Sequence, residues 1–350
     1  MTKHPLLQRA RDEGHPLIDG ETVTFLWEGK SAPRLVDDLH GWEENPQALT
    51  RLAPGLFACS FHLPRDAYLE YAFLDPETDE HVPDPCNKRR IWNGVNDYNH
   101  FFYMPEAAPS PLVRRKRDVH RGILTKHLLP AWMLSNDGKR TVYLYQPKAD
   151  QPLPLLVVYD GNDYLQRGKL AIMVDNLIAE KRIRPLAMAF LGHGGPRRFV
   201  EYACSEATLA WLDHDVLPLA LERLNLLDVN KNPGAYGVLG ASMGGLMALY
   251  TGLRMPDVFG NVLSQSGAFH FEQFDTVTVD LVRHLPKREL CIWMDAGKLE
   301  WLLESSQKMH RLLKQKGYNV TYREFTGGHC YTAWRDDLWR GLETLFGMKK

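Results

Sequence analysis

The chain has 350 residues, of which 44% are hydrophobic and 24% are charged, as in an ordinary globular protein. This length favours two domains over one. The formal net charge of −1 offers no basic face for nucleic acid or an anionic membrane. No apolar run approaches the roughly 18 residues of a membrane-spanning helix. We therefore expect neither a nucleic-acid nor a membrane partner.

Cysteine usage and the N-terminus bear on the compartment. The cysteines are odd in number and none forms a C-x-x-C pair: Cys59, Cys86, Cys204, Cys291 and Cys330. We therefore expect neither a disulfide framework nor a zinc site, and no metal or cofactor. Residues 1–19 lack the apolar stretch of a secretory signal. Together these features predict a cytoplasmic protein.

Residues 22–102 read as short strands separated by turn residues. The clearest strand patterns cover 22–27, 56–63 and 69–74, and Gly, Pro and Asp separate them. This pattern predicts a small antiparallel β-sandwich. The proline-rich segment 104–111 then breaks the pattern. We place the domain boundary there, with one domain over 1–110 and a second over 111–350.

After this segment, strand patterns alternate with helical ones. The expected strands are 123–128, 141–145, 155–159, 186–191, 235–239, 262–265, 290–294 and 320–325. The main expected helices are 207–225, 243–254 and 301–315. Such alternation predicts a mainly parallel sheet covered on both faces. Eight strands, with the first two paired as a hairpin, are the number found in an α/β-hydrolase domain.

The segment Gly240-Ala241-Ser242-Met243-Gly244 matches the G-x-S-x-G motif. It follows the fifth expected strand and precedes a helix, which is the context that a nucleophile elbow requires. The flanking glycines leave room for a strained serine at the tip of the turn. We therefore expect Ser242 to be a catalytic nucleophile.

A serine nucleophile needs a histidine base and a carboxylate that orients the base. Only His329 follows the last expected strand, where the fold places its base. Two carboxylates, Asp295 and Glu300, lie just beyond the seventh strand. Both remain candidates for the acid. The position of Glu300, on the far side of a loop, better suits a side chain that must reach another loop.

The oxyanion hole should combine the backbone N–H of Met243 with an N–H from the loop after the third strand. In that loop, Gly161 and Asn162 are the candidates. His193-Gly194-Gly195 resembles an oxyanion motif of lipases, but it follows the fourth strand. We therefore expect it to be a decoy.

These motifs resemble those of the enterochelin (ferric enterobactin) esterase family, which belongs to the esterase D-like α/β hydrolases. The same order occurs in both: Asp160-Gly161, then 198–202, Gly-Ala-Ser242-Met-Gly-Gly, and the ending 327–335. Segments 22–27 and 82–87 resemble the family's N-terminal sandwich, an early-set immunoglobulin-like domain. The resemblance covers most of the chain.

The resemblance implies roles for individual residues. It makes Ser242 the nucleophile and His329 the base, and it favours Glu300, which stands where related esterases have an aspartate. Cys330 also departs from the family, which usually has aspartate after the histidine. The implied reaction is hydrolysis of a catecholate triserine lactone, through an acyl-enzyme, which releases iron from a siderophore.

An anionic siderophore requires cationic and aromatic contacts. We expect substrate contacts from Arg198, Asp160, Tyr202 and Trp334. Internal roles remain open, with Arg198 pairing with Glu201 and Arg335 pairing with a nearby aspartate.

Two other functions remain open. One is a feruloyl- or acetyl-type, or general, carboxylesterase whose sandwich binds carbohydrate. The other is a hydrolase-fold binding protein without activity. In either enzymatic case the partner is a small-molecule ester, and the sequence leaves the oligomeric state open.

Overall fold

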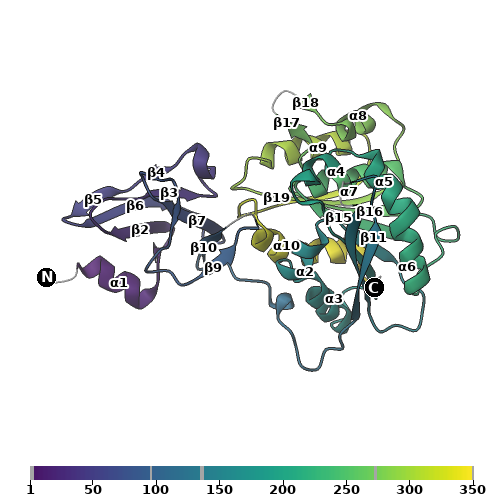
Figure 1. The fold of residues 1–350 in the computed structure, drawn as a ribbon, viewed down its shortest axis with the longest axis horizontal. Helices are drawn as coiled ribbons and strands as arrows, with labels where there is room; N and C mark the ends of the chain where they lie inside the picture. The colour runs from purple at the N-terminus through teal and green to yellow at the C-terminus, as the bar shows by residue number, and fades with distance from the viewer. Residues whose placement is uncertain (1–3, 95–96, 135–137, 272–273, 349–350) are drawn as a thin grey trace. The chain divides into compact units, whose positions relative to one another are not determined.

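The computed structural model describes residues 4–94, 97–134, 138–271 and 274–348 (Figure 1). The chain forms two compact units. Unit 1 contains residues 1–109 and two later segments, Gly297–Trp301 and Thr326–Ala333. Unit 2 contains Ser110–Ala296, Leu302–Phe325 and Trp334–Lys350. The main division therefore falls at the proline-rich segment, but two short pieces from later in the chain belong to the first unit.

Unit 1 is built on an antiparallel β-sandwich. One sheet has the order β1 (Leu17–Asp19), β2 (Thr22–Glu28), β6 (Leu56–His62), β5 (Thr50–Ala53). The other has the order β4 (Gln47–Ala48), β3 (Arg34–Asp37), β7 (Tyr68–Leu74), β10 (Tyr98–Tyr103), β9 (Arg90–Trp92), and β8 (His81–Val82) pairs with β7. Inward-facing residues of both sheets, including Phe25, Leu35 and Tyr71, form one core. The predicted sandwich is confirmed.

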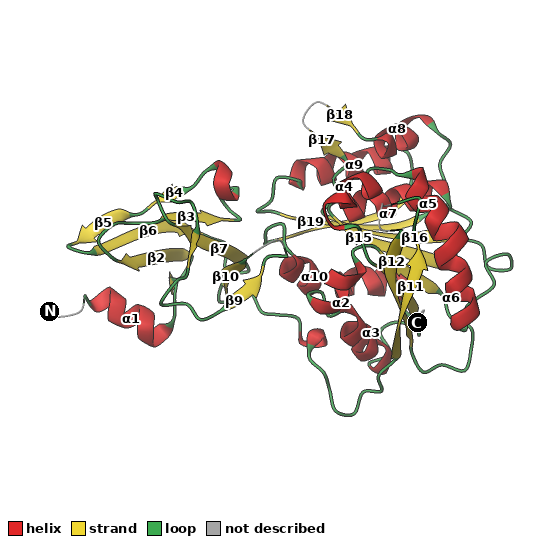
Figure 2. Cartoon of the chain, in the orientation of Figure 1, coloured by secondary structure: helices red, strands yellow, loops and turns green. Residues whose placement is uncertain are grey.

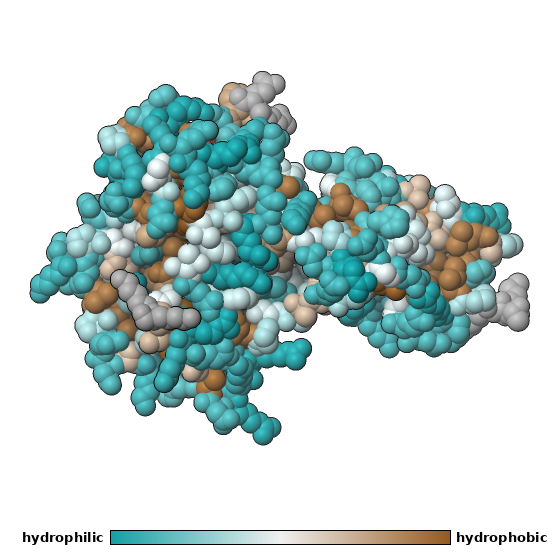
Figure 3. Space-filling model, turned by 180° about the vertical axis from the view of Figure 1, so that it is seen from behind, coloured by the Kyte–Doolittle hydropathy of each residue, from teal (hydrophilic) through white to brown (hydrophobic). Residues whose placement is uncertain are grey.

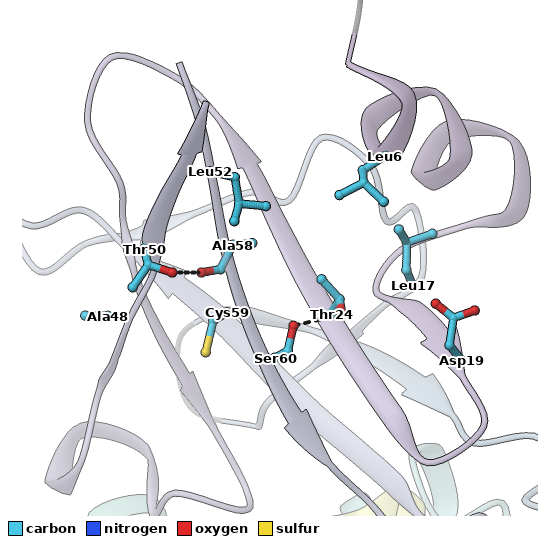
Figure 4. Close-up of a pocket in the computed structure, with 10 residues that line it drawn as sticks. All are labelled: Leu6, Leu17, Asp19, Thr24, Ala48, Thr50, Leu52, Ala58, Cys59 and Ser60. Carbon is cyan, nitrogen blue, oxygen red and sulfur yellow. Dashed lines mark hydrogen bonds between the residues drawn. The ribbon is translucent and has the colours of Figure 1, made fainter. Parts of the chain in front are cut away.

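The first helix, α1 (Pro5–Glu13), was not predicted. Its buried Leu7 and Ala10 pack with Leu17 and Leu26, so α1 covers part of the sheet that contains β1 and β2. An open hollow of about 530 Å³ lies over the same sheet (Figure 4). Its polar lining is already paired: Thr24 Oγ1 and Ser60 Oγ are 2.9 Å apart.

Unit 2 contains an eight-stranded sheet of order β11-β12-β14-β13-β15-β16-β19-β20. The strands are β11 (Ile123–Pro130), β12 (Lys139–Gln146), β13 (Leu155–Val158), β14 (Ala187–Leu191), β15 (Tyr236–Ala241), β16 (Phe259–Gln265), β19 (Cys291–Gly297) and β20 (Asn319–Phe325). β11 and β12 are an antiparallel pair, and the strands from β14 to β19 run parallel. This order is the α/β-hydrolase order, and the predicted strands are confirmed to within a few residues.

Helices cover the sheet on both faces (Figure 2). They are α2 (Gly161–Gln166), α3 (Leu170–Ala179), α4 (Arg198–Tyr202), α5 (Glu206–Trp211), α6 (Leu217–Arg223), α7 (Met243–Arg254), α8 (Val277–His284), α9 (Leu303–Gln315) and α10 (Tyr331–Phe346). Gly252 of α7 packs on Val262, whereas Gly341 of α10 packs on Leu263. Consecutive strand residues point to opposite faces, so α7 and α10 lie on opposite faces of the sheet.

The helix expected over 207–225 is confirmed: α5, a π-helical turn at Leu212–Val216 and α6 follow one another without a break from Glu206 to Arg223. The helix expected from Trp301 begins two residues later, at Leu303, after a turn at Trp301 and Leu302.

The outer surface is mixed in character. On the face seen in Figure 3, hydrophobic residues emerge in several separate places among hydrophilic ones. Across the described ranges, none of the helices has the length and apolar character that crossing a membrane requires.

Candidate active site

Ser242 occupies the sharp turn between β15 and α7. Its backbone dihedrals are φ 59° and ψ −124°, a strained conformation for a residue with a side chain. The turn is tight because Gly240 packs directly on the backbone of Gly244: a Cβ added at Gly240 would lie 2.9 Å from the Gly244 Cα. The Ser242 N–H donates to the Gln265 carbonyl at 2.9 Å, which ties the turn to β16. The geometry is that of a nucleophile elbow.

Two helices begin near the strand ends that should form the oxyanion hole. Met243 is the first residue of α7, and Gly161 is the first residue of α2. The first N–H groups of a helix have no acceptor within that helix and lie at its positive end. A glycine is needed at position 161 because a Cβ added there would lie 2.5 Å from the Leu191 N, so the Gly161 Cα packs directly on β14.

Asp160, just before α2, is held by several partners. It adopts a left-handed conformation with φ 52°. Its buried carboxylate accepts two hydrogen bonds from Arg198, at 2.7 Å from Nε and 2.6 Å from Nη2. The same Nη2 donates to the carbonyl of Ala241, the residue before the nucleophile, at 3.2 Å. Arg198 therefore connects the α2 loop with the nucleophile elbow. The expected pairing of Arg198 with Glu201 is replaced by this one, because Glu201 pairs with Arg140.

The lipase-like segment at His193 uses its own donors internally. The Gly194 N–H donates to Glu201 Oε2 at 3.1 Å, and the Gly195 N–H donates to His193 Nδ1 at 3.0 Å. A hydrogen bond to Asp163 raises the pKa of His193, although burial by itself would lower it. These bonds support its interpretation as a decoy.

His329 and Glu300 form a close pair in unit 1. His329 Nδ1 lies 2.8 Å from Glu300 Oε2, and the Glu300 side chain is fully buried. The other carboxylate oxygen of Glu300 accepts the Gly297 N–H at 3.1 Å. The two loops are joined by a bond from the Leu299 N–H to the Gly327 carbonyl at 3.1 Å. We call residues 326–330, which carry His329, the base loop.

Asp295, the other candidate acid, lies within β19 and is completely buried. Its Oδ2 accepts hydrogen bonds from Gln265 Nε2 at 2.9 Å and from Trp293 Nε1 at 3.3 Å. Asp295 thus belongs to a hydrogen-bond network inside unit 2, while Glu300 is the carboxylate beside the histidine.

The other expected substrate-contacting residues are buried. The Tyr202 hydroxyl accepts the Asp160 N–H at 3.1 Å, and burial raises the pKa of Tyr202 well above its usual range. Trp334 Nε1 donates to Ser266 Oγ at 2.8 Å. Of the four residues expected to contact the substrate, Arg198 alone is partly exposed, with 19% of its side-chain surface accessible. Direct substrate contact by these residues stays a prediction. Arg335 pairs with Asp336 at 3.0 Å, which confirms the internal role expected for it.

Several residues around the histidine were not found from sequence. The ring of Trp301 lies 4.5 Å from the imidazole of His329, centroid to centroid. Asp38, from the loop after β3, packs against Gly328. Trp301 follows Glu300 directly, so adjacency could have drawn attention to it. No local sequence signal points to Asp38.

The strand order and the serine elbow define the class of protein, an α/β-hydrolase. Within the described ranges, no group of three or more His, Cys, Asp or Glu side chains is arranged to hold a metal ion. In hydrolases of this fold, a serine on such an elbow is the residue that attacks a carbonyl carbon.

Comparison with known proteins identifies the family. Residues 135–345 match the family model described as "Putative esterase", and this match covers more than half of the chain. The chain therefore belongs to this esterase family.

Individual relatives agree with this assignment. The chain is 30% identical to the iron(III) enterobactin esterase of Dickeya dadantii in an alignment 288 positions long, which covers 75% of this chain and 65% of that one. It is 26% identical to the iron(III) enterobactin esterase of Escherichia coli, over 88% of this chain and 84% of that one. Its fold is similar to that of the ferric enterobactin esterase of Salmonella typhimurium, with a TM-score of 0.79 and 21% identity over 94% of this chain and 95% of that one.

Proposed function

We propose that this esterase hydrolyses the ester bonds of a catecholate siderophore of the triserine-lactone type. Ser242 acts as the nucleophile, His329 as the general base and Glu300 as the acid that orients it. The observation that carries the proposal is the 2.8 Å pairing of His329 Nδ1 with the buried Glu300 carboxylate. This pairing favours the tautomer that keeps Nε2 as the proton acceptor.

The reaction follows from these roles. Ser242 Oγ attacks the ester carbonyl while His329 Nε2 accepts its proton. The negative charge that develops on the carbonyl oxygen is stabilised by the N–H of Met243 and by that of Gly161 or Asn162. The protonated imidazole then gives its proton to the leaving alcohol, which is a serine hydroxyl of the lactone. Water then attacks the acyl carbonyl while His329 Nε2 accepts its proton. The protonated imidazole gives a proton to Ser242 Oγ, which leaves, and the acid product is released.

The substrate class is supported by the relatives and by the chain's own motifs. Both curated relatives described above are named for iron(III) enterobactin. Ser242, Glu300 and His329 follow one another in the chain order Ser, then acid, then His, which is that of α/β-hydrolases. The ferric ion is part of the substrate in this proposal.

The test has two parts. A fluorophosphonate probe should label the wild-type protein at Ser242, and Ser242→Ala should lower turnover by a factor on the order of 10⁶. Asp295→Asn should retain far more activity than Glu300→Gln, since Glu300 is hydrogen-bonded to the base and Asp295 Oδ2 accepts bonds from Gln265 and Trp293. A Ser242→Ala protein with full activity would contradict the mechanism.

Purified protein should then be supplied with ferric enterobactin, its linear fragments, a feruloyl ester and a simple aryl acetate. Cleavage of the siderophore with a higher kcat/KM than the other esters supports the proposed substrate. If the siderophore stays intact while feruloyl or aryl esters are cleaved, the substrate assignment is wrong although the chain is still an esterase.

A further inference from the structure

The base loop is bound to the sandwich along its whole length. The Tyr68 N–H, at the start of β7, donates to the Thr326 carbonyl at 3.0 Å. Thr326 Oγ1 donates to Asp66 Oδ2 at 3.1 Å. These bonds explain why residues 326–333 group with residues 1–109 in one compact unit.

Gly328 lies directly against the side chain of Asp38. A Cβ added at Gly328 would overlap the Asp38 carboxyl group and would lie 2.5 Å from Asp38 Cβ. Rotation of the Asp38 side chain cannot relieve that contact, because its Cβ is fixed to the backbone. Asp38 is also held in place, since its carboxylate accepts bonds from the Glu70 N–H at 2.8 Å and from Trp42 Nε1 at 3.1 Å.

Cys330, on the other side of His329, is buried. Burial, followed by the nearby charges of Glu70 and Asp38, raises the pKa of Cys330 well above its usual range. Glu70 is itself fixed by Tyr68 Oη and Asn99 Nδ2, each at 2.9 Å.

We propose that the sandwich positions the catalytic base: Asp38 packs against Gly328 beside His329, and the bonds to Thr326 hold the start of the base loop, so that together they fix the place of the imidazole. This inference rests on the proposed function, in which His329 is the base. Asp38 is a positioning residue, because it contacts Gly328 and takes no part in the proton transfers.

Placement of a general base has a large effect on turnover. A displacement of about 1 Å can lower the rate roughly 100-fold while ground-state binding changes little. Loss of this positioning should therefore lower kcat and leave KM nearly unchanged. A loss of overall stability would have a different signature, because the molecules that remain folded would keep the wild-type kcat.

The test is a double-mutant cycle on the full chain, with a neutral aryl acetate as substrate. Gly328→Ala should lower kcat by up to roughly 100-fold, because its new methyl group displaces the base loop from Asp38. Asp38→Ala should lower kcat by itself, and Asp38→Asn, which keeps the side-chain shape, should recover much of the loss. In an Asp38→Gly background, Gly328→Ala should have a much smaller effect than in the wild-type background, because the Cβ and carboxyl group that its methyl group would meet are then absent. The rate of fluorophosphonate labelling should change in parallel with kcat.

Asp84→Ala is the matched control. Asp84 is a buried carboxylate of the same sandwich that pairs with His15 and Tyr71. Its loss should lower Tm and leave kcat unchanged at temperatures well below unfolding. The proposal is overturned if Asp84→Ala lowers kcat as much as Asp38→Ala does. It is also overturned if Gly328→Ala has the same effect in both backgrounds, or none.

Parallel measurements on Ser242→Ala and His329→Ala separate the two proposals. If these variants keep their activity, the proposed function is wrong. If they lose activity while the Asp38 and Gly328 variants keep the wild-type kcat, only the positioning role is wrong.

Discussion

Arg198 contacts two parts of the site through one guanidinium group. It binds the Asp160 carboxylate with two hydrogen bonds and the Ala241 carbonyl with a third. The guanidinium carbon of Arg198 lies 5.2 Å from the centroid of the Tyr202 ring. The Tyr202 hydroxyl in turn accepts the Asp160 N–H. Arg198 can therefore keep the α2 N-terminus and the elbow in register, and this explanation does not require an anionic substrate.

We predict that Arg198→Ala lowers kcat by up to roughly 100-fold, because the oxyanion donors lose their relative placement. The loss should be similar for a neutral aryl acetate and for an anionic catecholate ester. Steady-state kinetics on both substrates would measure it. Asp160→Asn should show non-additive behaviour with Arg198→Ala in a double-mutant cycle.

Arg197, the adjacent residue in sequence, is the matched control, and Arg197→Ala should change kcat little. A rise in KM for the anionic ester alone in Arg198→Ala would instead favour direct substrate binding by Arg198. That result would support the role expected from sequence and contradict the internal one.

At the scale of elements, the base loop encloses Cys330. The resemblance noted in the sequence led us to expect aspartate after His329, but Cys330 stands there, buried and close to the charges of Glu70 and Asp38. Burial and the charge of Glu70 already raise the pKa of Asp38 well above its usual range. A third carboxyl group in this place would lack a cationic partner in the cluster described above. A thiol whose pKa is raised by burial fills the position without adding a charge.

We predict that Cys330→Asp lowers the free energy of unfolding by on the order of 3 kcal/mol, because a buried polar group loses hydration without a matching partner. It should also lower kcat, since Cys330 is adjacent to His329. Chemical denaturation and kinetics would measure both effects. In a Glu70→Gln background the penalty should be smaller, because one neighbouring charge is removed.

Cys291→Asp provides the comparison for this substitution. Cys291 is exposed at the start of β19, so its replacement should change stability by no more than about 0.5 kcal/mol. Equal effects at positions 291 and 330 would refute the argument from the buried carboxylates.

For the molecule as a whole, the two compact units do not correspond to two continuous stretches of the chain. The unit that contains the sandwich also contains Glu300 and His329, whereas Ser242 belongs to the other unit. Leu299, next to Glu300, packs against the sandwich core around Phe25. Loss of structure in the sandwich should therefore remove the base and the acid from their places.

We predict that Phe25→Ala, which removes a fully buried ring from the sandwich core, lowers the stability of unit 1 by about 4 kcal/mol. The temperature at which esterase activity is lost should fall together with the unfolding transition of unit 1. Calorimetry and thermal inactivation on the same samples would test this. Leu52→Ala on β5, where Leu52 is 51% exposed, should leave both temperatures nearly unchanged. Activity that persists through the transition shifted by Phe25→Ala would show that the sandwich is dispensable.

Periodicity and local motifs in the sequence were sufficient for the architecture. The change from alternating short strands to strand–helix repeats predicted both the sandwich and the eight-stranded sheet, because residue patterns of period 2 and 3.6 reflect which side of an element is buried. The elbow at Ser242 and the histidine after the last strand were also predictable, since both depend on position along the chain. These features are local, so the sequence by itself determined them.

Which carboxylate pairs with His329, and which residue packs against the base loop, could be decided only from the tertiary structure. Asp295 and Glu300 are five positions apart and chemically alike, and only the folded chain places Glu300 beside His329 and encloses Asp295 in a network with Gln265. Likewise, only folding brings Asp38 against Gly328. Contacts of this kind join residues far apart in sequence, and they depend on how whole elements pack. For that reason the role of the sandwich in holding the base loop became visible only in three dimensions.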